Sequence, residues 1–393
     1  MPGPLTGLKV LDFTTLLPGP YSTLTFADLG AEVLRVVSGS RPELTSQMPP
    51  FIAGTDISAN IAWLGRGKKS ITLNLKDPRA IEIIHKLIME YDILIEQFRP
   101  GVMAKFGLGY SDLKEVNSAL IYASLTGYGQ TGPLRDKAGH DINYISRSGI
   151  MSYSGRIDTG PSLTGMQIAD VASGSNNMTI GVLAALIHRK NSGKGQYIDI
   201  SMMDGVIAFN AMAGAGYLVD GREPGREKEY LNGGSLYDFY ETKDGKYISF
   251  GGLEPKFFKA FCNATGCSDL IPGGVTPPNS EQVKERVRSV IREKTRDEWM
   301  DTFKDVDACV EPVRSMGEVL DDSQTAETGM VVKVKLSDGS IVRQLGNPIR
   351  FSETPQEYGE AGLPAGSHTK DVLLKLGYSE KDIEEFRKTG LFD

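Results

Sequence analysis

The sequence predicts an α/β protein that combines a large doubly wound, Rossmann-like domain with a small α+β domain. Three observations support this fold class. The chain has 393 residues, which is too long for one ordinary core, so two domains are expected. Residues 8–37 form a strand, a turn, a helix, a glycine and a second strand, the pattern of a βαβ unit in a parallel sheet. After Asp220 this alternation ends, and hairpins and charged helices follow.

The large domain is expected over residues 1–200. Its strands are short apolar segments, and its helices carry apolar residues at helical spacing, as Ile81, Ile84 and Ile88 do. Glycine and proline residues mark the turns between them. On these criteria, strands are predicted over 8–13, 31–37, 70–75, 92–98, 119–125 and 196–200. Helices are predicted over 21–29, 77–90, 111–117 and 173–190, and a long polar loop over 39–60.

A long apolar helix over 201–219 is expected to carry the chain out of this domain, so residues 201–230 are assigned to a linker helix and loop. The small domain is expected over 231–320, where two alternating segments flank a Lys-Asp-Gly turn typical of a hairpin. Pro255, which follows Glu254, suits the first turn of a helix. Other elements are predicted as charged helices over 281–295 and 297–306, a hairpin over 330–344 and two helices, 370–376 and 380–388, in a C-terminal segment spanning 321–393.

The composition excludes several classes of partner. A net charge of −7 and a pI near 5.4 argue against non-specific binding to nucleic acid or to an anionic membrane. No signal-peptide pattern begins the chain, and the most apolar stretch, 205–219, is broken by Asn210 and is too short to insert into a membrane. The three cysteines have no metal-ligand spacing with histidine, so no metal site is expected, and reduced thiols indicate a cytoplasmic location.

The first strand–helix turn does not fit a nicotinamide-dependent dehydrogenase. Residues 16–20 are Leu-Leu-Pro-Gly-Pro in place of Gly-x-Gly-x-x-Gly. The second strand contains Arg35 and is followed by Ser38, where an acidic residue would be needed to bind a ribose hydroxyl. Arg35 suits a phosphate better, although an ordinary surface arginine has the same sequence signature.

Four cations, Arg66, Lys68, Lys69 and Arg99, stand at predicted strand or loop edges. Open α/β sheets bind ligands at such edges, and clustered cations in an acidic protein favour a polyphosphate ligand. The same residues also fit solvated loop charges, so both interpretations stay open on the residues alone.

One of the four histidines lies in a context that favours acid–base chemistry. His140 follows a glycine-rich run over 126–133, and Asp170 supplies a carboxylate further along the chain. An imidazole beside a flexible loop, with a separate carboxylate in reach, is the minimum needed to move a proton at neutral pH. The alternative is a loop histidine whose ring is satisfied by a backbone carbonyl.

Several separated motifs resemble, in order, those of the family III CoA-transferase superfamily. They are Pro-Leu-x-Gly-Leu-x-Val-Leu-Asp over 4–12, Ala-Asp-Leu-Gly-Ala-Glu-Val over 27–33, Arg-Pro-Gly over 99–101, Gly-Tyr-Gly-Gln-Thr-Gly-Pro over 127–133 and Gly-Lys-Gly-Gln over 193–196. The resemblance extends from residue 4 to about residue 320 and returns weakly in the tail. It implies the family III CoA-transferase fold, in which C-terminal residues return to the large domain, and an interlocked homodimer.

The same resemblance implies a ligand and the residues that bind it. The ligand is an acyl-CoA, whose CoA moiety is part of the substrate, and no prosthetic group is expected. Arg35, Lys69 and Arg99 would hold the CoA phosphates, with Leu17 and Gly129 also at the CoA site.

Two chemistries share this fold. In the transferases an aspartate attacks the thioester as a nucleophile, whereas in the α-methylacyl-CoA racemases the equivalent aspartate is one of two acid–base groups. Asp170 matches in either case. The Gly-His-Asp-Ile-Asn-Tyr run over 139–144 matches the racemase motif in full, and Glu254 matches the racemase glutamate that partners the histidine. Transferases usually carry a longer glycine run than the Gly-Gly at 233–234.

The predicted activity is therefore inversion of the α-carbon of a 2-methyl-branched acyl-CoA, by proton transfer between two bases through an enolate. His140, oriented by Glu254, takes the proton from one face, and Asp170 returns one to the other. Backbone N–H groups near Asp141, also assigned to the catalytic site, stabilise the enolate oxygen. The alternatives are an acyl-CoA:carboxylate CoA-transferase with Asp170 as nucleophile and a catalytically silent CoA-ester-binding subunit. The methionines of 201–219 fit either an acyl-chain lining or ordinary core filling.

Overall fold

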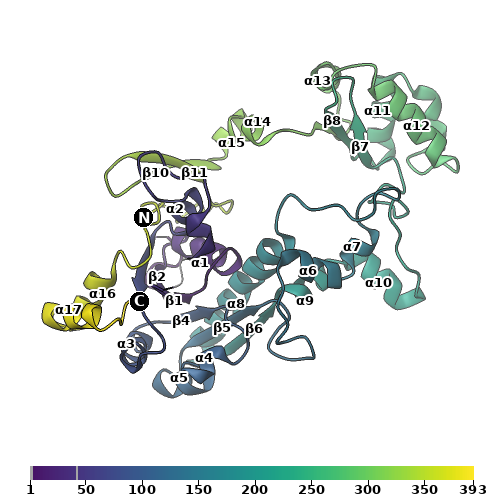
Figure 1. Ribbon diagram of the computed structural model, residues 1–393. Coiled ribbons are helices and arrows are strands. Elements are labelled where there is room, and N and C mark those ends of the chain that lie inside the picture. The colour runs from purple at the N-terminus through teal and green to yellow at the C-terminus, as the bar shows by residue number, and fades with distance from the viewer. Residues whose placement is uncertain (1–2, 41–42) are drawn as a thin grey trace. The chain divides into compact units, whose positions relative to one another are not determined.

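The computed structural model describes residues 3–40 and 43–393, which divide into two compact units (Figure 1). Unit 1 contains the described residues up to Ser148, together with Met166–Ala208 and Gln324–Asp393, and unit 2 contains Gly149–Gly165 and Phe209–Ser323. Residues 149–165 therefore belong to unit 2, although the sequence placed them in a 1–200 domain. Contacts with distant residues of unit 2 hold them there, since Arg156 pairs with Glu227 and Asp238 and Arg226 donates to backbone carbonyls of this segment.

Unit 1 is built on a six-stranded parallel sheet with the order β3-β2-β1-β4-β5-β6. This order confirms the predicted doubly wound fold. The direction of winding reverses between β1 and β4, and ligands of such sheets bind where the carboxyl ends of the strands flank that reversal. The strands are β1 (Lys9–Phe13), β2 (Glu32–Val37), β3 (Lys68–Thr72), β4 (Ile93–Glu96), β5 (Ile121–Thr126) and β6 (Tyr197–Ser201).

Helices cover both faces of this sheet, in agreement with the nearly continuous burial along β1 to β5. Leu11 and Phe13 of β1 join one core cluster with the helices on their face. Asp12 points to the other face, where it accepts a hydrogen bond from Thr23 of the first helix. The helices beside Leu11 are α3 (Pro78–Ile88), α4 (Val102–Lys105), α5 (Tyr110–Val116), α16 (Thr369–Lys375) and α17 (Glu380–Lys388). On the other face lie α1 (Pro18–Asp28) and α8 (Asn176–Ser192), which contact each other.

Two N-terminal segments differ from the prediction. The turn predicted around residues 17–20 is the first turn of α1, because Pro18 supplies a backbone already suited to the first helical position. The loop predicted over 39–60, of which residues 41–42 lie outside the described part, contains a short 3₁₀ turn, η1 (Leu44–Gln47), and the start of α2 (Ala59–Leu64). The Ser58 side chain caps α2 by accepting the Asn60 N–H.

The predicted single helix over 201–219 is wrong. The structure has two helices, α9 (Met202–Ala208) and α10 (Ala211–Asp220), with a break between them. Asn210 interrupts the helix, and its side-chain oxygen accepts a hydrogen bond from the Tyr153 hydroxyl, so the break is fixed by a contact distant in sequence. Within the described residues no single helix has the length and apolarity to cross a membrane, and only this pair meets the criteria when its two parts are taken together.

Unit 2 contains the predicted hairpin and helices, with a third strand that was too short to predict. Its aromatic core includes Phe250, Phe261 and Trp299. The antiparallel strands are β7 (Asp238–Glu241), β8 (Tyr247–Phe250) and β9 (Val310–Pro312). The helices are α7 (Ile150–Tyr153), α11 (Pro255–Thr265), η3 (Ser268–Gly273), α12 (Ser280–Ile291), α13 (Arg296–Phe303) and α14 (Met316–Leu320).

The C-terminal segment packs within unit 1, where the hairpin β10 (Val331–Lys335) and β11 (Ile341–Leu345) follows α15 (Ser323–Glu327) and lies beside α2 (Figure 1). Arg66 joins the two ends of the chain here. Its guanidinium is 1% exposed, makes two hydrogen bonds to Asp28, and donates to the Gln344 side chain. Arg66 is thus a structural residue, and the hypothesis that it belongs to a cationic ligand-binding edge is wrong.

Candidate active site

A pocket of about 490 Å³ opens in unit 1 at the carboxyl ends of β4 and β5, beside the start of α1. This is the place that the winding order predicts, because Pro18 follows β1 and Gln97 follows β4. The sequence candidates His140, Asp170 and Arg99 all line it. The other lining residues include Leu16, Phe98, Thr126, Tyr128, Arg135, Lys137, Asn143, Tyr144 and Met202.

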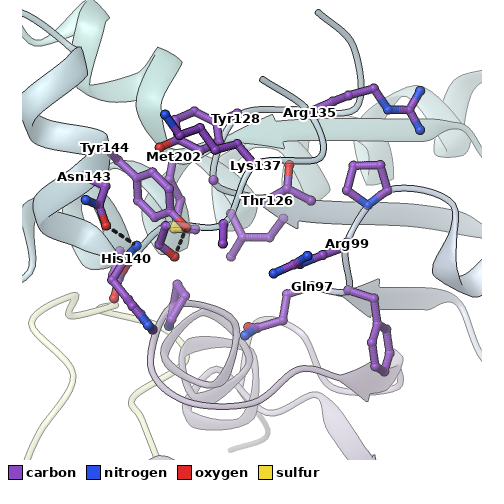
Figure 2. A pocket seen from close by; sticks show the side chains of 18 of the residues that line it. Gln97, Arg99, Thr126, Tyr128, Arg135, Lys137, His140, Asn143, Tyr144 and Met202 are labelled. Atoms are coloured by element: carbon purple, nitrogen blue, oxygen red, sulfur yellow. Dashed lines mark hydrogen bonds between the residues drawn. The ribbon is translucent and has the colours of Figure 1, made fainter. Parts of the chain in front are cut away.

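His140 is held at this pocket by the start of a helix. It precedes α6 (Asp141–Arg147) as the N-cap residue, and its backbone N–H donates to the Asn143 side chain at 3.0 Å (Figure 2). The Asn143 N–H in turn donates to the His140 carbonyl at 2.8 Å. The backbone is therefore fixed, whereas within the described part of the chain no hydrogen bond is formed by the imidazole ring. The alternative of a ring satisfied by a backbone carbonyl is not what the structure contains.

Asp170 lies on a π-helical turn, η2 (Ile168–Ser175), which runs directly into α8. Such turns are uncommon and occur frequently at functional sites, since the wider turn changes the direction of one side chain. The Ser175 hydroxyl donates to the carbonyl oxygens of Asp170 and Pro18, at 3.0 and 2.6 Å. This hydroxyl ties the turn to the beginning of α1, another wall of the pocket.

Asp141 connects the two acid–base candidates. Its carboxylate oxygen Oδ1 accepts the backbone N–H groups of Ala169 at 2.6 Å and Asp170 at 3.0 Å. Since Asp141 directly follows His140, one side chain fastens the Asp170 turn to the His140 helix start. The Asp141 carboxylate is not among the groups that line the pocket, so its contacts are those of a positioning residue.

The electrostatics of Asp170 suit proton transfer. Burial is the largest cause that raises the pKa of its carboxyl group, the negative charge of Asp141 also raises it and the neighbouring His140 lowers it, and together they bring this pKa to about 6. Within the described residues no donor hydrogen-bonds to the Asp170 carboxylate, which leaves burial dominant. A carboxyl group with this pKa is present in both protonation states near neutral pH.

Cations line the pocket across from His140. Figure 2 shows Arg99 and Gln97 on the opposite side from His140, with Lys137 above the space between them. In the described part of the chain neither Arg99 nor Lys137 has an acidic partner within ion-pair distance, whereas Arg135 lies 3.6 Å from Asp136. Lys137 and Arg135 were not among the residues predicted from the sequence. The signal was the charged Arg-Asp-Lys run in the loop that follows β5, just before His140.

Two predicted phosphate ligands do not line this pocket. Arg35 is 4% exposed and pairs with Glu43 at 2.7 Å. Lys69 is partly exposed and lies 3.7 Å from Glu32. The adjacent Lys68 is buried, donates to Pro20 and Thr23, and has its pKa lowered by burial to about 7. A phosphate role for Arg35 and Lys69 stays a prediction. Lys68 is a structural residue that forms hydrogen bonds inside unit 1.

The remaining predicted residues are placed as follows. Leu17 and Gly129 do not line the pocket, but their neighbours Leu16, Pro18 and Tyr128 do. Glu254 is an exposed residue of unit 2 at the N-cap of α11, and its contact with His140 stays a prediction. Backbone N–H groups near Asp141 begin α6, where first-turn N–H groups have no partner within the helix.

A doubly wound sheet with a pocket at its switch point, lined by an imidazole, a carboxyl group of raised pKa and several cations, is the arrangement expected of an α/β enzyme's active site.

Comparison with known proteins then identifies the family. The chain belongs to CoA-transferase family III, whose family model matches residues 5–369. It is 32% identical to alpha-methylacyl-CoA racemase of Homo sapiens, over 99% of this chain and 97% of the relative. It is also 32% identical to succinate–glutarate CoA-transferase of Agrobacterium fabrum, over 96% and 97%. The crystal structure of a CaiB/BaiF family protein from Brucella suis matches with a TM-score of 0.85 and 28% identity, covering 96% of this chain and all of that one.

The chain is thus an enzyme of the family III CoA-transferase and racemase superfamily. Racemases and transferases are similar to it at nearly the same identity, so the choice between the two chemistries depends on the site.

Proposed function

We propose that this protein is an α-methylacyl-CoA racemase, which inverts the α-carbon of a 2-methyl-branched acyl-CoA. The observation that carries the proposal is that His140 and Asp170 line one pocket with Arg99 and Lys137. Two acid–base groups are thereby available beside cations that suit the CoA phosphates. The racemase-type run over 139–144 supports the same activity.

Proton transfer takes place in two steps. The His140 imidazole removes the α-proton of one enantiomer, the negative charge spreads onto the thioester oxygen, and protonated Asp170 delivers a proton to the opposite face. For the other enantiomer the roles exchange, so that the Asp170 carboxylate removes the proton and the His140 imidazolium delivers one. The pKa of Asp170, about 6, supports this double role because both of its protonation states are accessible.

The thioester α-proton is only weakly acidic, so the enolate oxygen needs donors that are already in place. The backbone N–H groups of Asp141 and Ile142, at the first turn of α6, are our candidates. The Asp141 carboxylate accepts hydrogen bonds from the backbone N–H groups of Ala169 and Asp170. These bonds fix the start of α6, and with it the candidate donors, relative to Asp170.

Replacing Arg99 tests the binding side of the pocket. We expect Arg99→Ala to raise the Kd for CoA and the KM for a CoA thioester by about 10- to 150-fold, because a charge-assisted hydrogen bond to a phosphate contributes about 1.5–3 kcal/mol. The kcat should change little, since Arg99 does not contact the reacting carbon in this proposal. Calorimetric titration with CoA and steady-state kinetics provide the two measurements.

Lys105→Ala is the matched control, because Lys105 is an exposed cation on α4 whose removal changes the net charge equally. An unchanged KM in Arg99→Ala, or an equal effect in the control, would count against a phosphate contact.

The proposed activity itself is tested by α-proton exchange. The enzyme is incubated in D₂O with one enantiomer of a 2-methylacyl-CoA, and deuterium uptake and optical inversion are followed by mass spectrometry and NMR. We expect both to occur without any carboxylate acceptor. Absence of exchange at enzyme concentrations that bind the thioester would overturn the proposal.

A second candidate is an acyl-CoA:carboxylate CoA-transferase with Asp170 as nucleophile. The 32% identity to the succinate–glutarate transferase favours it, and Asp170 fits the nucleophile position equally well. This activity predicts acyl-dependent inactivation by hydroxylamine or borohydride, transfer of CoA to an added carboxylate, and no deuterium at the α-carbon.

The proposal includes a homodimer, an acyl-CoA substrate with no prosthetic group, and a cytoplasmic location. Support for the dimer comes from α10, where Met212, Leu218 and Val219 are 73, 86 and 89% exposed. An apolar face of this kind is expected to be covered by another surface. Orientation of His140 by Glu254 belongs to the same proposal.

A further inference from the structure

A buried carboxylate lies directly behind the cationic wall of the pocket and has no part in the chemistry proposed above. Glu96 ends β4 and is 4% exposed. Within the described chain it forms no ion pair, so its charge is balanced by hydrogen-bond donors alone. Burying a carboxylate without an ion-pair partner destabilises the folded state, so we expect Glu96 to have a function.

The donors to Glu96 connect it to the pocket. Its Oε2 accepts the backbone N–H of Phe98 at 2.7 Å, and its Oε1 accepts a short hydrogen bond from the Ser124 hydroxyl of β5. Phe98 lies between Gln97 and Arg99, all three of which line the pocket. The Glu96 carboxylate therefore stabilises the turn over residues 97–99, which follows β4 and contains Arg99.

The same turn is tied to a second wall. The Gln97 side-chain oxygen accepts the Gly19 N–H of α1 at 3.2 Å. Gly19 follows Pro18, which also lines the pocket. A weaker hydrogen bond between Glu96 and Phe98 therefore affects the position of Arg99 and, through Gln97, the start of α1.

The surroundings of Glu96 make its charge responsive to pH. From β5 it faces Ser124 and Tyr122, and from β6 it faces Asp199 and Tyr197, whose hydroxyl donates to Ser124 at 3.1 Å. Its β1 neighbour in register is the apolar Phe13. Burial raises the pKa of Glu96 to about 7, the Ser124 and Phe98 hydrogen bonds lower it, and the charge of Asp199 raises it.

We infer that Glu96 is a positioning residue whose ionised carboxylate fixes the Gln97–Arg99 wall, so that its protonation loosens this wall and weakens ligand binding. An N–H bond to a carboxylate is stronger than the same bond to a neutral carboxyl or amide oxygen. Above its pKa Glu96 holds Phe98 through the stronger bond, and below it through the weaker one. Affinity should therefore fall as the pH decreases through about 7.

Glu96→Gln and Glu96→Ala test this inference, with Glu115→Gln on the exposed surface of α5 as the control. Glutamine retains an acceptor for Phe98 and a donor for Ser124 but cannot become charged. We expect the ratio of the Kd for CoA of Glu96→Gln to that of the wild type to be near one at pH 6 and to rise about fivefold by pH 8. Groups that titrate in both proteins, including the CoA phosphates, cancel in this ratio. Ser124→Ala, which removes a donor to the carboxylate, should shift the transition to higher pH.

The CoA measurement rests on the proposed function, so a second readout uses the ligand-free protein. Hydrogen–deuterium exchange of the peptide that contains Phe98 should show stronger protection at pH 8 than at pH 6, after correction for intrinsic exchange rates, in the wild type only. Glu96→Ala should lose the protection at both pH values. Wild-type protein that shows this pattern but does not bind CoA contradicts the proposed function alone. A pH-independent Kd ratio, or identical protection in all variants, overturns the role of Glu96.

Discussion

His140→Ala is expected to reduce optical inversion of a 2-methylacyl-CoA by at least about 10²-fold, the lower range for a positioned general acid–base group. Inversion needs a proton taken from one face and returned to the other, so loss of the imidazole stops it in both directions. Exchange without inversion should persist for the enantiomer that Asp170 deprotonates. The Kd for CoA should stay nearly unchanged, because Arg99 and Lys137 are intact. Chiral analysis combined with α-deuterium counting separates these outcomes.

His188→Ala provides the control, since it removes an exposed histidine of α8 outside the pocket. Full inversion activity in His140→Ala would refute the two-base assignment. Transfer of CoA to a carboxylate at wild-type rate in the same variant would favour the transferase chemistry, in which the imidazole is not required.

Asp170→Asn is expected to eliminate turnover in either chemistry, by about 10²–10⁴-fold or more, because the same carboxyl group is the acid–base partner of His140 or the nucleophile. The variant should also be more stable than the wild type at pH 8. Burial raises the folded-state pKa from 3.8 to about 6, so above pH 6 the folded protein holds a charge that the unfolded chain would solvate better.

The sign of the stability effect follows from this shift. Since the raised pKa belongs to an acid, the cost of the charge is present above about pH 6 and disappears as the pH falls toward 3.8, where both states are protonated. The difference in melting temperature between Asp170→Asn and the wild type should therefore shrink between pH 7 and pH 4. Asp158→Asn, at an exposed position, is the control. A variant that is inactive and also less stable at pH 8 would indicate a structural defect instead.

Strands and helices were largely predictable because their signals are local. The strand over residues 8–13, the glycine stop at Gly30 and the helix over 77–90 correspond to β1, the end of α1 and α3. Each depends on spacing within a few residues. The single helix over 201–219 failed because Tyr153, distant in the sequence, contacts Asn210 and stabilises the break between α9 and α10.

The site was predictable in part for the same reason. His140, Asp170 and Arg99 were found from short motifs, and all three line one pocket. Lys137 lines the same pocket but was not predicted, because a short charged run in a loop, Arg-Asp-Lys over 135–137, does not show by itself which of its side chains faces a ligand. Arg35 carried a phosphate signature, yet its guanidinium pairs with Glu43, a contact that spacing does not reveal.

The sequence by itself determined the fold class, the superfamily and the chemical types at the site, because apolar periodicity and contiguous motifs are properties of neighbouring residues. Only the tertiary structure decided which charged side chains are free to bind a ligand and which are buried or paired. It buried Arg66 against Asp28, joined Asp141 to the backbone of Asp170, and placed Glu96 behind the Arg99 wall. Burial and charge pairing depend on contacts between segments that are distant in the chain. Desolvation at those contacts shifts the pKa values of the site residues.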